Sequence, residues 1–104
     1  MTGAAGFIGS HLAERLVAEG CHVLGIDCFS SNYARTDKER NLAGLADAAG
    51  FALVEDDICT RSLAGSLRGC DAVVHLAAVP GVRTADRATM GRVNVEGTDR
   101  KSVV

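Results

Sequence analysis

Three glycines spaced three residues apart open the chain and lead directly into a segment with helical periodicity. Gly3, Gly6 and Gly9 run into an amphipathic stretch whose apolar residues recur every four positions from Ile8. Glycine adopts positive φ and has no Cβ, so this backbone can approach a pyrophosphate, while Gly9 would let the helix lie close to its sheet. The N-terminus of that helix also favours an anion, because its N–H groups are unpaired. We therefore predict a phosphate-binding turn, with an ordinary helix start as the alternative; the residues lining it would be Gly3, Gly6, Phe7, Ile8 and Gly9.

An apolar run that ends in a carboxylate follows the predicted helix. The helix over about 8–19 should end at Gly20, and residues 22–27 are typical of a buried strand whose last residue is Asp27. Its distance from the glycine turn is close to the ~20 residues expected for the acid that binds an adenosine ribose. A carboxylate there would accept hydrogen bonds from both ribose hydroxyls and repel a 2′-phosphate, which favours NAD over NADP. The alternative is a strand-end residue that caps a turn.

Apolar runs alternate with helical segments along the rest of the chain. We expect strands over 51–55 and 72–78, helices over 37–49 and from 60 through 67, and a last helical segment from about residue 86. This alternation predicts an α/β fold with a parallel sheet and right-handed connections. A glycine turn of this kind normally follows a central strand. Only Met1 precedes the turn, and one residue cannot form a strand at ~3.3 Å per residue, so we expect the first strand to be missing.

Charge and composition argue against several classes of function. The net charge is −2 and no basic run occurs, so neither nucleic acid nor an anionic membrane is an expected partner. No apolar stretch reaches the ~18 residues of a membrane span, and no signal-peptide pattern is present; we therefore expect a cytoplasmic protein. The four cysteines lack Cys-x-x-Cys spacing and paired histidines, which predicts no metal site.

Four segments in chain order carry a family signature. They are the glycine turn Thr2–Leu12, the acidic-aliphatic triplet Asp56–Ile58, the apolar run Val73–Ala78, and Asn94–Thr98 with the sequence Asn-Val-Glu-Gly-Thr. Together they resemble the extended short-chain dehydrogenase/reductase family, the NAD-dependent epimerases and dehydratases of nucleotide sugars. The resemblance implies NAD as cofactor and a partial Rossmann-type doubly wound parallel sheet, in a single partial NAD-binding domain over 1–104.

Three shorter segments resemble one branch of that family. Phe29–Tyr33, Lys38–Leu42 and Pro80–Arg83 are similar to the uronate 4-epimerases. Enzymes of this branch act on UDP-glucuronate and related sugars. A nucleotide-sugar substrate is therefore implied for the complete enzyme, which the resemblance also allows to be a homodimer.

The resemblance implies further binding residues. Asp57 and Ile58 would contact the adenine, and Leu76, Ala77 and Ala78 would pass along the cofactor ribose. Asn94 would form a hydrogen bond near the cofactor, and Arg83 would face the nucleotide sugar. The alternatives are an acidic loop for the adenine pair, core packing for the strand residues and a solvated loop for the arginine. His75 is expected to be a hydrogen-bonded core residue rather than a catalytic one.

The chain lacks the pair of residues that carries the chemistry of the family. The resemblance implies a Tyr-x-x-x-Lys pair, in which the tyrosine moves a proton of the sugar hydroxyl and the lysine lowers the tyrosine pKa. The only tyrosine is Tyr33, and Asp37 occupies the lysine position, so no catalytic residue is predicted. We expect an N-terminal piece of a longer epimerase or dehydratase, inactive by itself. The alternatives are a non-catalytic dinucleotide-sensing module and a non-functional gene fragment.

Overall fold

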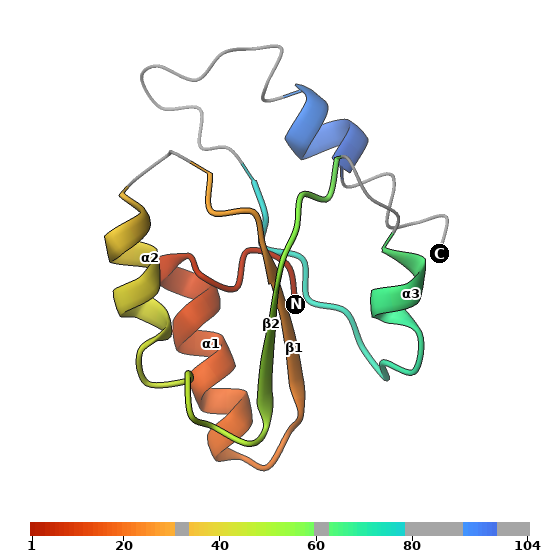
Figure 1. The fold of residues 1–104 in the computed structure, drawn as a ribbon. Coiled ribbons are helices and arrows are strands. Elements are labelled where there is room, and N and C mark those ends of the chain that lie inside the picture. Colours follow the sequence, from red (N-terminus) through yellow and green to blue (C-terminus); the bar gives the residue numbers. More distant parts are fainter. Residues whose placement is uncertain (31–33, 60–62, 79–90, 98–104) are drawn as a thin grey trace.

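The computed structural model describes residues 1–30, 34–59, 63–78 and 91–97 (Figure 1). Its helices and strands follow the predicted alternation. In chain order they are α1 (Phe7–Ala18), β1 (Val23–Asp27), α2 (Arg35–Leu42), β2 (Phe51–Glu55), α3 (Ala64–Leu67) and the π-helical segment η1 (Gly91–Gly97). In this part of the chain no helix is both long and apolar enough to cross a membrane.

The two strands form a parallel sheet with helices on both faces. β1 and β2 pair in register from Val23 opposite Phe51 to Asp27 opposite Glu55. α1 and α2 lie side by side along one face, and α3 lies on the other (Figure 1). The first face holds a core of Ala5, Ala13, Val23, Leu42 and Leu45. The second holds a smaller core of Ile26, Ile58 and Leu63.

Helix α1 confirms the predicted helix after the glycine turn. Its C-cap is Glu19, and the N–H groups of Gly20 and Cys21 donate to the carbonyls of Val17 and Leu16, at 3.0 and 2.9 Å. These two bonds are the Schellman pattern that ends a helix. The predicted end at Gly20 is therefore confirmed.

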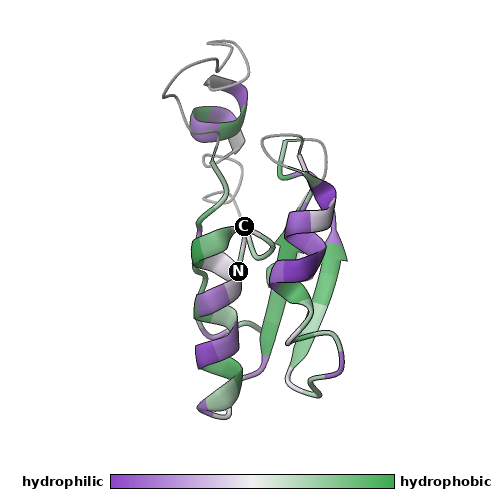
Figure 2. Cartoon of the chain, turned by 90° about the vertical axis from the view of Figure 1, so that its left-hand side faces the viewer, coloured by the Kyte–Doolittle hydropathy of each residue, from purple (hydrophilic) through white to green (hydrophobic). Residues whose placement is uncertain are grey.

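Helix α2 is shorter than the predicted helix over 37–49. It ends at Leu42, and the chain continues as tight turns in which Leu45 donates to the Leu42 carbonyl at 2.9 Å. Gly44 lies at the break, and glycine is a poor residue for continuing a helix. Leu42 and Leu45 are nonetheless both buried. Figure 2 shows that α2 is largely hydrophilic while the strands beneath it are hydrophobic.

The expected strand over 72–78 is wrong, and the reason is the shortness of its neighbour. The segment is extended, but only His75 pairs, in a single parallel bridge with Thr2. Thr2 donates from its N–H to the Val74 carbonyl at 2.9 Å and accepts from the Leu76 N–H at 3.2 Å. On its other side the Ile26 N–H donates to the Met1 carbonyl at 2.8 Å. Met1 and Thr2 thus occupy the position between β1 and this segment, and two residues cannot pair with the full length of either.

A cavity of about 770 Å³ continues the line of Met1 and Thr2 toward the start of both strands. Its walls include Met1, Val23, Phe51, Ala72 and Val74. The Met1 ammonium group lies at its edge and donates to the Leu24 carbonyl at 2.7 Å. The cavity therefore has the place and the backbone partners of a central strand.

We predict that an aliphatic extension before Met1 fills this cavity and stabilises the sheet. About five valine or isoleucine residues, the usual length of a strand, would pair with backbone groups of β1 and of residues 72–74 and bury apolar surface at ~25 cal/mol per Å². Thermal unfolding of the 104 residues alone should be broad, and that of the extended chain cooperative and at higher temperature. An extension of serine and glycine is the control. A sharp transition of the unextended chain at the same temperature would contradict this account.

Candidate dinucleotide-binding site

The first glycine of the turn is required by both its conformation and its surroundings. Gly3 has φ +70°, which residues with a Cβ rarely adopt. A Cβ at this position would lie 2.8 Å from the Ala77 nitrogen and 2.8 Å from the Leu76 carbonyl carbon. The turn thus packs against two residues that the sequence predicted along the cofactor. Gly6 closes it by donating from its N–H to the Gly3 carbonyl at 3.1 Å.

Gly9 allows the first turn of α1 to pack against the glycine turn itself. A Cβ on Gly9 would lie 2.0 Å from the Gly3 carbonyl oxygen, a distance that no side chain can occupy. The sequence predicted that this glycine would let the helix approach its sheet. The structure shows that the close neighbour is the backbone of Gly3, at the edge of that sheet.

The N-terminus of α1 presents uncapped backbone donors to its surroundings. Gly6 is the N-cap, it offers no side-chain cap, and no acidic residue lies in the first turn. The first N–H groups of a helix have no partner within it. The side chains of Phe7 and Ile8 are exposed, at 71% and 67%. This end of the helix therefore has the donors and the partial positive charge that suit a pyrophosphate.

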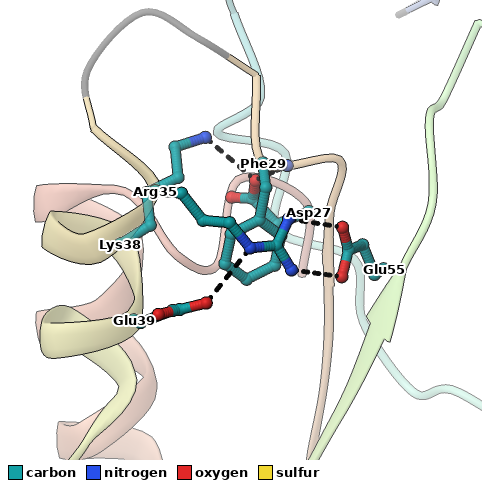
Figure 3. Close-up of polar contacts among 6 residues, drawn as sticks. All are labelled: Asp27, Phe29, Arg35, Lys38, Glu39 and Glu55. Atoms are coloured by element: carbon teal, nitrogen blue, oxygen red, sulfur yellow. Dashed lines mark hydrogen bonds and ion pairs between the residues drawn. The ribbon is translucent and has the colours of Figure 1, made fainter.

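The carboxylate of Asp27 lies beside the turn and is bound by three donors, among them Lys38 (Figure 3). One of its oxygens accepts from the Ala5 N–H at 3.0 Å. The other accepts from the Phe29 N–H at 2.8 Å and the Lys38 ammonium at 3.0 Å. A carboxylate has about four acceptor positions, and the donors of the described residues occupy three of them, two on one oxygen and one on the oxygen that faces Ala5. This geometry leaves room for one ribose hydroxyl rather than the two expected from the sequence; the ribose role itself stays a prediction.

Lys38 and Asn41 are site residues that the sequence analysis missed. The side chains of Lys38 and Asp27 are only 7% and 5% exposed, so this is a buried ion pair. Asn41 donates from its side chain to the Ala5 carbonyl at 3.0 Å. Together with Leu42 and Leu45, these two residues have the i, i+3, i+4, i+7 spacing of one helix face. That spacing could have identified them as inward-facing.

The predicted adenine pair lies in the loop after β2. The Asp57 side chain accepts from the Cys59 N–H at 2.8 Å, and Ile58 is buried against Ile26 and Leu63. The backbone of this loop is next to Asp27, since the Asp56 N–H donates to the Asp27 carbonyl at 3.0 Å. The loop and Asp27 are thus neighbours, while the adenine contact itself stays a prediction.

The remaining predicted residues are placed as follows. His75 is half-buried and hydrogen-bonded, with Nδ1 2.5 Å from the Thr2 hydroxyl oxygen, which confirms the expected hydrogen bonding. Ala78 is exposed at the end of the extended segment. Asn94 is half-buried in η1, whose backbone meets the loop after β2 where the Cys59 thiol donates to the Arg92 carbonyl at 3.3 Å. Arg83 lies outside the described residues.

A second charged cluster lies at the same edge of the sheet. The Arg35 guanidinium donates to both carboxylate oxygens of Glu55, at 2.8 and 2.9 Å, and through Nε to Glu39 at 3.1 Å. The guanidinium carbon of Arg35, Cζ, lies 4.5 Å from the centroid of the Phe29 ring. The hydrogen bonds from Arg35 lower the pKa of Glu55. Among the described residues no group of three or more His, Cys, Asp or Glu side chains is placed to hold a metal ion.

These features are typical of a dinucleotide-binding sheet edge, and comparison with known proteins identifies the family of the chain. Residues 1–100 match the NAD dependent epimerase/dehydratase family. The chain belongs to this family. The predicted fold, a partial Rossmann-type sheet, is confirmed, and NAD, the predicted cofactor, is the cofactor of the family.

Individual relatives narrow the likeness to UDP-sugar epimerases. The chain is 44% identical over 86 residues to a protein described as the uncharacterized UDP-glucose epimerase YtcB of Bacillus subtilis, covering 82% of this chain and 27% of that protein. It is 42% identical over 86 residues to a probable UDP-glucuronate 4-epimerase of Rhizobium meliloti, covering 80% and 25%.

Solved structures give the same likeness. The structure of UDP-glucuronic acid 4-epimerase from Bacillus cereus in complex with UDP-glucuronic acid and NAD superposes with a TM-score of 0.89 at 39% identity. The match covers 95% of this chain and 33% of that one. The chain thus spans about a third or less of the length of the relatives it matches.

We predict that Lys38→Met destabilises the protein strongly. It would leave the buried Asp27 carboxylate without its cation, a change that typically costs about 3–5 kcal/mol. Arg40→Met is the matched control, since Arg40 lies on the same helix with its side chain 79% exposed, and surface changes usually stay within ~0.5 kcal/mol. Urea unfolding of the longest natural form of the protein measures both. Equal midpoints for the two variants would show that the ion pair does not stabilise the fold.

Proposed function

We propose that this chain is the NAD-binding portion of a UDP-sugar 4-epimerase. The observation that carries the proposal is the uncapped N-terminus of α1, which lies beside a buried strand-end carboxylate at the carboxyl edge of a parallel sheet. That edge is where open α/β sheets bind ligands. The family and the solved relatives with NAD support the same conclusion.

The described residues fit NAD by their donors and by their shape. The N–H groups at the start of α1 would hold the pyrophosphate, and Asp27 would accept from one hydroxyl of the adenosine ribose. Asp57 and Ile58 would lie at the adenine, and Asn94 near the cofactor. Gly3 lets the turn approach Leu76 and Ala77 at a distance that any Cβ would block; with Ala78, these would border the ribose side. Bound NAD supplies the acceptor and donor of a hydride at the sugar carbon that changes configuration.

The substrate we propose is UDP-glucuronate or a related UDP sugar. Relatives named as UDP-glucuronate and UDP-glucose epimerases support this choice, as does the relative crystallised with UDP-glucuronic acid. Arg83 would face the nucleotide sugar. Residues 1–104 contain no Tyr-x-x-x-Lys pair, so the 104 residues alone should bind without turning over. We further propose a cytoplasmic location, and a homodimer for the complete enzyme.

Two measurements test the proposed function on the longest natural form of the protein. Titration with NAD, followed by fluorescence or calorimetry, should show saturable binding. Incubation with UDP-glucuronate and with UDP-glucose should then give the C4 epimer of at least one of them, while the 104 residues alone should give none. NAD binding without conversion of any UDP sugar would favour a dinucleotide-sensing module instead. Absence of NAD binding would refute the proposal.

We predict that Ile8→Asp weakens NAD binding without destabilising the fold. The side chain of Ile8 is exposed in the first turn of α1, where a carboxylate favours the helix by about 0.3–1 kcal/mol. The same negative charge would repel the pyrophosphate. Ile8→Asn, similar in size but neutral, is the control. NAD affinity should fall for the aspartate variant relative to the asparagine one, while the melting temperature should be equal or higher; equal affinities would place the pyrophosphate elsewhere.

A further inference from the structure

The Arg35 cluster lies directly beside the acid proposed to bind the ribose. Glu55 is the register partner of Asp27 at the ends of the two paired strands. Phe29 donates its N–H to Asp27, and its ring lies under the Arg35 guanidinium. Figure 3 shows the two groups of contacts side by side at this edge. The Arg35 guanidinium is thus joined to the Asp27 carboxylate through one residue, Phe29, which contacts both.

An arginine near the ribose could bind a 2′-phosphate, whereas the carboxylate of Asp27 would repel it. In dinucleotide-binding sheets of this type, an arginine near the ribose accommodates the 2′-phosphate of NADP. Arg35 has the charge and the fork geometry for that task. In this structure, however, three of its N–H groups already bind carboxylates, two at Glu55 and one at Glu39. The three side chains together carry a net charge of −1, which a phosphate would not approach favourably.

We propose that Glu55, assisted by Glu39, is a specificity-determining residue that holds Arg35 in a carboxylate clamp and thereby excludes NADP. This inference rests on the proposed NAD-binding function and adds a second element to the discrimination provided by Asp27. Asp27 would repel the 2′-phosphate directly, whereas the clamp would keep the Arg35 guanidinium bound to carboxylates and so unable to offset that repulsion.

The geometry of the Arg35–Glu55 pair favours binding, while its exposure to water limits its strength. The bidentate geometry of Arg35 on Glu55 is the favourable one for a guanidinium and a carboxylate. Both side chains are about half exposed, at 54% and 49%, so the pair is screened by water and salt. Loss of one carboxylate would leave Arg35 with a single partner and make the local charge neutral.

The test compares nucleotide affinities of Glu55→Gln with those of the unaltered protein. Glutamine keeps the size of the side chain and removes its charge, so the fold should be retained, as a thermal melt will show. We expect the ratio of NADP to NAD affinity to rise about tenfold, the effect of roughly one charge-assisted hydrogen bond to phosphate. Binding is measured by calorimetry on the longest natural form of the protein, with NAD and NADP in parallel.

Two further variants separate the clamp from a general change of charge. Asp37→Asn removes one negative charge from the same helix, and with it the ion pair between Asp37 and Arg40, whose atoms are 3.3 Å apart. This variant should leave the affinity ratio unchanged. Arg35→Gln added to Glu55→Gln should cancel the gain, because the cation that would meet the phosphate is gone. A gain that persists in this double variant, or appears equally with Asp37→Asn, would overturn the proposal.

The remaining outcomes distinguish this inference from the proposed function. If the unaltered protein binds NAD and Glu55→Gln does not change the affinity ratio, the clamp is refuted and the NAD-binding function stands. If the unaltered protein binds neither nucleotide, both are refuted, because a device for selectivity requires a nucleotide to select.

Discussion

The carboxylate of Asp27 is the interaction on which the arrangement of the site depends. It binds the Ala5 N–H in the glycine turn, the Phe29 N–H after β1 and the Lys38 ammonium on α2. Asn41 of α2 binds the carbonyl of the same Ala5. Both the N–H and the carbonyl of Ala5 are therefore hydrogen-bonded to side chains. These bonds fix the turn and, through it, the direction in which α1 begins. Because a buried charge is costly without a partner, Lys38 is as necessary to this arrangement as Asp27.

The second constraint is the short segment between β1 and residues 72–78. Met1 and Thr2 bond to β1 on one side and to the extended segment on the other. These few hydrogen bonds fix the position of Gly3 at the sheet edge, where Leu76 and Ala77 come within contact of it. The carboxyl edge of the sheet is thus well formed, and the opposite end is open as a cavity. The candidate site lies at the well-formed end.

The sequence allowed the turn, the first helix and the strand-end acid to be predicted because each depends on local chemistry. Gly3 requires a positive φ, Gly20 ends α1, and Asp27 follows a short apolar run. The spacing of Lys38, Asn41, Leu42 and Leu45 could have placed Lys38 on the inward face of its helix, but nothing in the sequence pairs it with Asp27, 11 residues earlier. The strand expected over 72–78 failed because pairing depends on a neighbour rather than on the run itself.

A crystal structure of the longest natural form with NAD bound would test the central claim most directly. The account predicts the pyrophosphate on the N–H groups at the start of α1, with Asp27 still bound to Ala5 and Lys38 and accepting from a single ribose hydroxyl. A nucleotide bound away from this helix would contradict it. So would an Asp27 carboxylate that has released Lys38 to take both hydroxyls, since the turn would then not depend on that buried pair.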